Sequence, residues 1–375
     1  MRFLHLADLH IGIRVNGFSM LEDQTFFMDR LFRCLDRDPV DAVVLAGDIY
    51  DKADPSAEAV DLFDALLSGL ADRVAHVLVI PGNHDSPERI AYAGKLLEKQ
   101  GVHIAPVYQG QIREITLHDQ YGPVHFFLLP FLKPSSVRRF FPEETIEDYA
   151  DALSCVFAHL SLNTEERNIL VSHQFVSGAL RSDSEQISIG GLDAIPRSVF
   201  SAFDYVALGH IHRPQTMGEE KLRYAGSPLK YSLSEVDQEK AILFVTLGEK
   251  GELSFTRETL PKLRDMRVIQ GSFEELMHPD EEAPRDDYLQ VILKEDHEIP
   301  EVLSRLRTLY PNIMRLDYEN RWKQREETEQ IPQLDLLPPL EIFSNFFQMQ
   351  TGKPLTEEQE EFVSREMEEV QNETH

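Results

Sequence analysis

The sequence predicts an α/β fold with layered sheets and helices, and two observations carry this prediction. Five short apolar segments each run directly into a cluster of polar residues, as buried strands do when they end in functional loops. Segments with a helical pattern lie between several of them. The apolar segments are residues 3–6, 42–45, 77–80, 169–171 and 205–208. This alternation is typical of layered α/β proteins, whose ligands gather at the carboxyl ends of the strands.

Helical patterns follow the first two of these strands. They cover residues 20–35 and residues 56–70, and the second comes directly after Pro55. Because proline is favoured at the start of a helix, this position supports the second helix.

A smaller unit is expected beyond a first domain of residues 1–260. Strand patterns occur at residues 266–269, 288–293 and 313–316, and helical patterns at residues 273–277 and 301–309 separate them. We therefore expect a small α+β domain at residues 261–320.

The last part of the chain is predicted to be a linker followed by two short helices. Residues 321–335 are largely charged and polar and indicate a linker. Within residues 336–375, helical patterns at 340–349 and 356–370 are separated by a break at 351–354. Two helices so placed could hardly bury their own apolar faces, so we expect them to form a helix-loop-helix that binds a partner.

Composition excludes a membrane protein and indicates a cytoplasmic one. The chain has 375 residues, of which 42% are hydrophobic and 27% charged, and no apolar run is long enough to cross a bilayer. The first eight residues contain charged and imidazole side chains, which leaves no room there for the apolar region of a signal peptide.

The net charge of -28 argues against a broadly basic surface for nucleic acid. Bound divalent cations supply positive charge locally, part of the acidic charge lies in the tail, and a partner could supply a basic surface. Candidates for phosphate contacts, with solvated charges or local ion pairs as the alternative, are Lys133, Arg138, Arg139, Arg181, Arg213 and Lys230.

Candidate metal ligands follow each of the five predicted strands. Asp8 and His10 are two residues apart, so their side chains share a face and both can reach one ion. Asp48 can bridge two ions with its two carboxylate oxygens. The other candidates are Asn83, His173, His210 and His212, whereas His84 beside Asn83 need not bind metal.

Each motif taken singly has an ordinary structural alternative. An Asp after a strand is often a turn or cap, and a lone His is usually a surface or core residue. Five clusters in order, each at a strand end, favour one shared site. Its mixed carboxylate, amide and imidazole donors suit manganese, iron or zinc, and a pair of such ions favours hydrolysis of a phosphoester.

These motifs resemble the calcineurin-like metallophosphoesterase superfamily, whose pattern is Asp-x-His, Gly-Asp, Gly-Asn-His, a separate His and Gly-x-His. Longer matches narrow the resemblance to the nuclease subunits of bacterial ATPase–nuclease complexes that process DNA. They lie at residues 4–12, 46–51, 82–86, 204–213 and 224–229. The resemblance implies a layered calcineurin-like metallophosphoesterase sandwich with a small α+β capping domain and C-terminal helices.

The resemblance also implies two manganese ions with Asp48 as their bridge. One ion would be held by Asp8, His10, Asp48 and His212. The other would be held by Asp48, Asn83, His173 and His210. His84 would stabilise the transition state or act as an acid toward the leaving oxygen, with an extra ligand or a structural imidazole as the alternative. Many archaeal and eukaryotic relatives carry histidine where this chain has Asp51, which could have a supporting role or be a helix cap or loop contact.

As partners, the resemblance implies DNA, positioned by the capping domain, and a coiled-coil ATPase clasped by the C-terminal helices. It further implies a homodimer within a heterotetramer, with residues 20–35 or 56–70 as candidate dimer helices. The aromatic stripe of Phe343, Phe346 and Phe347 independently calls for a surface to pack on, with the chain's own catalytic domain as the alternative. No phosphate-binding Gly-x-x-x-x-Gly-Lys-Ser/Thr loop occurs, so ATP dependence would come from another subunit.

Three functions compete at this point. The first is a DNA nuclease, acting as an exonuclease on double-stranded DNA and an endonuclease on hairpins or single strands. The second is a phosphatase or cyclic-nucleotide phosphodiesterase that acts on small molecules at the same metal centre. The third is a non-enzymatic scaffold, against which the full ligand set and His84 speak.

Overall fold

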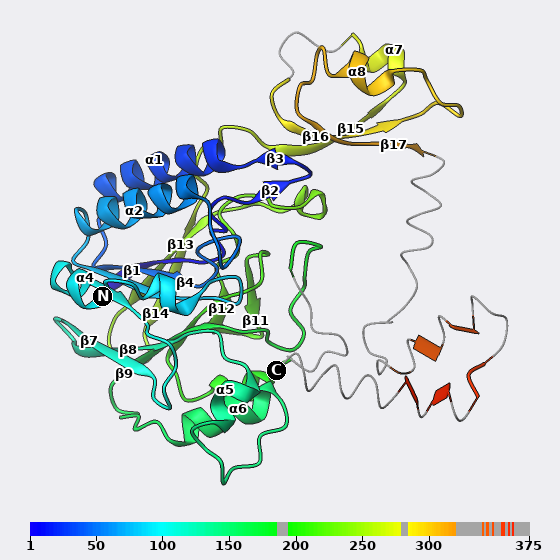
Figure 1. The fold of residues 1–375 in the computed structure, drawn as a ribbon. Coiled ribbons are helices and arrows are strands. Elements are labelled where there is room, and N and C mark those ends of the chain that lie inside the picture. Colours follow the sequence, from blue (N-terminus) through cyan, green and yellow to red (C-terminus); the bar gives the residue numbers. More distant parts are fainter. Residues whose placement is uncertain are drawn as a thin grey trace.

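The structure is a computed structural model (Figure 1). It describes residues 1–185, 194–278 and 284–319, and the short pieces 340, 343–344, 347–348, 354–356, 359–360 and 362–363. No helix within these ranges is both long and apolar enough to traverse a bilayer.

Two six-stranded sheets form the centre of the molecule. The first has the order β14 (Leu253–Glu258), β13 (Ile242–Leu247), β1 (Arg2–Leu6), β4 (Ala42–Ala46), β5 (His76–Ile80) and β6 (Val102–Ile104). The second has the order β11 (Gln215–Met217), β12 (Glu219–Tyr224), β10 (Tyr205–Gly209), β9 (Arg167–His173), β8 (Gly122–Leu129) and β7 (Arg113–Asp119). Strands β1, β4, β5 and β6 are parallel, as are β8, β9, β10 and β12, whereas the other pairings are antiparallel.

The sheets pack face to face through an apolar layer to which both contribute. Alternation along β1 shows how the sequence builds this layer, because side chains two apart share a face. Phe3 points between the sheets, where the centroid of its ring lies 5.5 Å from that of Phe126 in β8. Leu4 and Leu6 belong to the separate core on the other side of the sheet.

Helices cover the outer faces of both sheets (Figure 1). Helices α1 (Leu21–Arg37) and α2 (Ala57–Ala71) pack on the first sheet, and the Ser56 hydroxyl caps α2 by accepting from Ala59 N. Helices α5 (Pro134–Arg138) and α6 (Tyr149–Ala158) pack on the second sheet. The layered α/β fold predicted from the sequence is confirmed, and both predicted amino-terminal helices are present.

Short elements complete this part of the chain. A two-stranded hairpin and two short helices follow the amino-terminal strands, and single turns of 3-10 helix occur in the loops. They are β2 (Arg14–Val15), β3 (Phe18–Ser19), α3 (Pro87–Ile90), α4 (Gly94–Leu97), η1 (Glu98–Gln100), η2 (Arg197–Phe200) and η3 (Leu233–Glu235).

Beyond residue 260 the chain forms a separate three-stranded parallel sheet with its own apolar core. Its strands and helices are β15 (Met266–Gly271), α7 (Phe273–Leu276), β16 (Tyr288–Leu293), α8 (Val302–Leu306) and β17 (Ile313–Tyr318). The expected helix at residues 301–309 is shorter at both ends: Glu301, with a positive φ of 52°, precedes its first residue, and the chain turns out of the helix at Arg307. Of the aromatic stripe, Phe343 and Phe347 are helical and half-buried, whereas Phe346 lies outside the described residues.

Candidate metal centre

Five loops meet where strands of both sheets end. They follow β1, β4 and β5 of the first sheet and β9 and β10 of the second. Backbone bonds tie the first two loops together, since Asp8 N donates to Gly47 O at 3.1 Å and His10 N donates to Asp48 O at 2.9 Å. His210 N donates to the carboxylate of Asp8 at 2.8 Å and joins the second sheet to the first.

The backbone of these loops is strained at the candidate ligands. Asp8, His10, Asp48 and His210 all have positive φ values, of 54°, 43°, 49° and 102°. A non-glycine residue in such a conformation costs on the order of 1 kcal/mol or more, and such residues cluster at functional sites. Gly82 shows how tightly the loops pack, because a Cβ there would stand 2.1 Å from Asp48 Oδ1.

The structure brings Asp8, His10 and His212 together in one half of the site. His10 Nε2 and His212 Nε2 are 3.0 Å apart, and one ligand atom from each of the three residues lies within 4.8 Å of the others. All three side chains are buried.

The other half contains Asn83, His173 and His210. Asn83 Oδ1 lies 3.0 Å from His173 Nε2 and 2.9 Å from His210 Nδ1. Asp48 stands between the halves, because its Oδ2 is 3.2 Å from His173 Nε2 and 3.5 Å from His10 Nε2. The geometry therefore supports Asp48 as the bridge between two sites.

The donor set fits two divalent cations. Among the described residues no donor reaches the buried Asp8 Oδ2, and burial raises the pKa of Asp8 to about 6. A cation would stabilise this carboxylate in its charged form. Two ligand atoms that each lie about 2.1 Å from one ion, with a right angle between the two bonds, are about 3 Å apart. The facing imidazole and amide atoms described above have this spacing. Burial also lowers the pKa of His210 to about 3 and that of His10 well below its usual range, so both imidazoles are neutral donors.

Asp48 and His173 form a buried pair, in which Asp48 Oδ2 lies 3.2 Å from His173 Nε2. Burial opposes charge on both groups, but their mutual attraction raises the pKa of His173 to about 9 and holds that of Asp48 well below its usual range.

Outer hydrogen bonds fix which nitrogen each imidazole presents to the site. His173 Nδ1 donates to Ala46 O at 2.8 Å, which leaves Nε2 free to bind an ion. His212 Nδ1 donates to Ser184 Oγ at 2.8 Å, and that hydroxyl donates to Glu235 Oε1 at 2.6 Å. Glu235 is fully buried and also contacts Lys240 Nζ at 2.6 Å.

His84 lies beside the ligands but is held differently. Its Nδ1 donates to the backbone carbonyl of Asp51 at 2.9 Å, so Nε2 faces the site. The His84 ring is half-buried and lies 4.9 Å from the His10 ring. It also falls within ligand distance of His10 and Asp48, so position alone is compatible with a ligand as well as with an acid. Asp51 contributes here through its backbone.

Several residues that organise the site carry no local signal in the sequence. Gln24 lies in α1, Ser184 and Tyr231 lie in loops and Glu235 ends η3, and none of the four belongs to a ligand motif. Asp85 follows His84 directly and could have been noticed. Its carboxylate accepts from Ile49 N, Tyr50 N and Gly82 N, which joins two of the ligand loops, and burial raises its pKa to about 6.

Two of the candidate phosphate contacts have structural partners within the fold. Lys230 is buried and donates to Val236 O and Met266 O. Arg138 donates through Nε to Ile146 O at 2.7 Å. Both cations satisfy backbone carbonyls within the fold.

Comparison with known proteins identifies the family of the chain. The calcineurin-like phosphoesterase family matches residues 1–214, and the type 5 capsule protein repressor C-terminal domain matches residues 262–351. The chain belongs to the calcineurin-like phosphoesterase family, as its motifs predicted.

Curated relatives confirm the narrower resemblance. The SbcD subunit of the nuclease SbcCD from Staphylococcus saprophyticus is 31% identical over 98% of this chain and 98% of the relative. The protein of the same name from Staphylococcus epidermidis is 30% identical over 97% of each chain. Among solved structures, a dimetal phosphatase from Danio rerio is 14% identical, with a TM-score of 0.43 over 70% of this chain and 98% of that chain.

Proposed function

We propose that the chain is a two-metal DNA nuclease that serves as the SbcD subunit of an SbcCD-type complex. The position of Asp48 carries this proposal, because its carboxylate lies between two sets of donors, made of buried imidazoles, a buried carboxylate and the half-buried amide of Asn83. Such a bridged pair suits hydrolysis at phosphorus. The SbcD relatives, which are named as nucleases and matched over nearly their whole length, support a nucleic acid as the substrate.

The proposed ligands are Asp8, His10, Asp48 and His212 for one manganese ion and Asp48, Asn83, His173 and His210 for the other. Bound divalent ions supply positive charge to the phosphoryl oxygens and make a water acidic enough to attack at neutral pH. The protein orients the donors through the outer hydrogen bonds of His173 and His212. His84, with Nδ1 held by Asp51 O, is proposed to stabilise the transition state or to give a proton from Nε2 to the leaving oxygen.

The remaining parts of the chain have proposed roles in the same complex. Residues 1–260 form the nuclease domain and residues 261–320 the capping domain that positions DNA. Residues 321–335 link these to residues 336–375, whose Phe343, Phe346 and Phe347 bind the coiled coil of an SbcC-like ATPase. Two copies of the chain pair within a heterotetramer. The complex works in the cytoplasm, in DNA repair, recombination and replication. The chain acts as an exonuclease on double-stranded DNA and as an endonuclease on hairpins or single strands.

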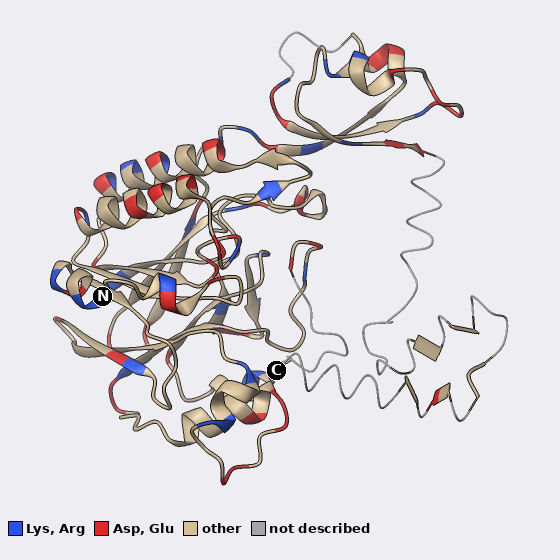
Figure 2. Ribbon diagram, in the orientation of Figure 1, with Lys and Arg blue, Asp and Glu red and all other residues tan. Residues whose placement is uncertain are grey.

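The surface charge suggests that metal ions and a partner protein, rather than this chain alone, supply the positive charge that binds the substrate. The net charge is -28. On the outer helices, α1 carries both basic and acidic residues and α2 carries only acidic ones, so these helices form no continuous basic face (Figure 2).

The decisive experiment measures cleavage of hairpin and blunt double-stranded DNA by the purified chain with manganese. An Asp48→Ala variant is the control, and bis(4-nitrophenyl) phosphate is the small-molecule comparison. We expect manganese-dependent cutting of DNA that disappears in the variant. Turnover of the dye without cutting of DNA, with or without an ATPase partner, would favour a small-molecule phosphodiesterase. No turnover of either by metal-loaded protein would favour a scaffold.

A further inference from the structure

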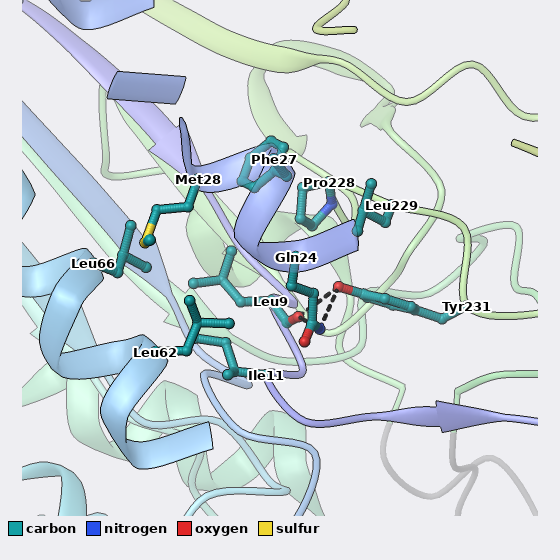
Figure 3. Close-up of a pocket in the computed structure, with 10 residues that line it drawn as sticks. All are labelled: Leu9, Ile11, Gln24, Phe27, Met28, Leu62, Leu66, Pro228, Leu229 and Tyr231. Atoms are coloured by element: carbon teal, nitrogen blue, oxygen red, sulfur yellow. Dashed lines mark hydrogen bonds between the residues drawn. The ribbon is translucent and has the colours of Figure 1, made fainter. Parts of the chain in front are cut away.

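Two neighbouring residues at the start of α1 serve different parts of the molecule. Gln24 Nε2 donates to Leu9 O at 3.1 Å and to His10 O at 2.9 Å, and its Oε1 accepts from Gly12 N at 3.0 Å. Gln24 thus holds the loop that carries His10 at three points. Figure 3 shows its amide directed at Leu9 and Tyr231.

Asp23 faces the unit beyond residue 260 instead. Its Oδ2 accepts from Arg264 Nη1 at 2.8 Å and from the Tyr288 hydroxyl at 2.7 Å. Consecutive residues of an α-helix point about 100° apart, which explains how adjacent side chains reach different partners. One rigid turn of α1 therefore contacts both the root of the small sheet and the metal loop.

A second pair of neighbours repeats this arrangement. Lys230 Nζ lies 3.0 Å from Asp265 Oδ1 and donates to Met266 O at 3.1 Å, at the start of β15. Tyr231 donates its hydroxyl to Leu9 O at 2.6 Å, and its ring packs on His10 and His212 at 5.8 and 6.0 Å.

The two pairs are joined and buried. Gln24 Nε2 donates to the Tyr231 hydroxyl at 3.1 Å, so one network spans both connections. Asp23, Gln24, Tyr231 and Tyr288 are each at most 6% exposed. Because an unpaired buried polar group is unfavourable, these side chains cannot change partners independently.

We propose that the pairs Asp23–Gln24 and Lys230–Tyr231 couple the orientation of the unit at residues 264–319 to the position of His10 and His212. Gln24 and Tyr231 are positioning residues, which act on the metal ligands through the backbone and through ring packing. A substrate or partner that shifts this unit changes the affinity of the Asp8–His10–His212 half for its ion, and the bound ion resists the shift by the same factor. This proposal rests on the metal centre of the proposed function.

The test measures manganese affinity by titration calorimetry and by electron paramagnetic resonance of free Mn²⁺ in the full chain. Arg264→Gln removes a partner of Asp23 without touching a ligand, and Tyr288→Phe is a milder change at the same carboxylate. Both variants should lower the affinity for one of the two manganese ions by about 3- to 10-fold. Gln24→Met should lower the affinity for the same ion by about 10- to 100-fold.

Two controls separate coupling from general damage. Arg267→Gln breaks an ion pair of 2.6 Å with Asp287 inside the small unit and should leave manganese affinity unchanged. The double variant Arg264→Gln with Gln24→Met should be no weaker than Gln24→Met alone, since both changes act through one network. Arg264→Lys should restore most of the affinity.

The outcomes distinguish this proposal from the function on which it rests. Unchanged affinity for both ions in folded Arg264→Gln and Tyr288→Phe, or an equal loss in Arg267→Gln, would overturn the coupling alone. A wild-type chain that binds no manganese would overturn the proposed metal centre and the coupling with it.

Discussion

The imidazole of His84 is the group whose role depends most on a single hydrogen bond. Its Nδ1 is committed to the carbonyl of Asp51, so only Nε2 can act in the site. The seven proposed ligands supply four donors to each ion without His84, with Asp48 shared between the two ions. His84 is therefore expected to matter for turnover more than for metal binding.

We predict that His84→Gln lowers kcat for DNA by about 10²- to 10⁴-fold, the usual contribution of a general acid or base. Manganese affinity should stay close to that of the wild type. Single-turnover cleavage and titration calorimetry measure the two effects separately, with Asp48→Ala as the variant that loses both ions. Equal loss of metal in His84→Gln would make His84 a ligand.

Ser184 bridges His212 and Glu235, whose Oε1 also lies 3.4 Å from His212 Nδ1 directly. Its hydroxyl accepts from His212 Nδ1 and donates to the buried carboxylate, which selects the tautomer with Nε2 free for an ion. Loss of such an outer partner typically weakens metal binding.

Ser184→Ala should therefore reduce affinity for one manganese ion by about 10-fold. The metal-free thermal unfolding midpoint should barely change, since one small, partly exposed hydroxyl is removed. Ser232→Ala, at the 3-10 turn that carries Glu235, is a matched control. If calorimetry shows both ions bound with unchanged affinity, Ser184 does not orient His212.

Among the strands, Arg167 of β9 ties the far ends of both sheets. It donates to Asp119 at 2.5 and 2.9 Å and to the carbonyls of Gly122 and Gly248, and it is 3% exposed. Its hydrogen bond holds the pKa of Asp119 well below the usual range. Because the folded-state pKa is depressed, the stabilisation is complete above the unfolded pKa of about 4 and is lost as pH falls below it.

Asp119→Asn should consequently flatten the dependence of unfolding free energy on pH between about 4 and 2. At pH 6 the variant should be less stable than the wild type, and the difference should shrink as the medium becomes more acidic. Urea unfolding across this range, with the exposed Asp29→Asn as control, measures the slope. Identical slopes for wild type and Asp119→Asn would refute the assignment.

For the molecule as a whole, we expect the catalytic and partner-binding functions to be separable. A chain that ends at residue 335 keeps both sheets, the small unit and every proposed ligand. It lacks the aromatic stripe, of which Phe343 and Phe347 are half-buried.

This truncated chain should hydrolyse bis(4-nitrophenyl) phosphate with manganese at the wild-type rate. Its affinity for an SbcC-like coiled coil should fall by about 30-fold or more, as expected when aromatic anchors are removed. Co-elution and calorimetry test the binding, and Phe343→Ala with Phe347→Ala in the full chain isolates the stripe. Undiminished binding by the truncated chain would assign the ATPase contact to another surface.

Local patterns were enough to predict the layered fold and the segments that end in candidate ligands. Strands β1, β4, β5, β9 and β10 were expected within two residues of their observed ends, because a buried run followed by a polar loop is a local signal. The other strands of the two sheets carried no such signal and were not identified; they are β6, β7, β8, β11, β12, β13 and β14. The sandwich of two sheets was expected only from the family resemblance.

The sequence by itself determined which residues can bind metal, since their chemical types and their places after strands are written along the chain. Only the tertiary structure decided how they are held. Tyr231 bonds a carbonyl 222 positions earlier, and His210 N bonds Asp8 across 202 positions. No periodicity encodes such contacts, because they depend on the packing of one sheet against the other. The same packing places Asp48 between the two halves of the site and sets Gln24 and Asp23 between the metal loop and the small unit.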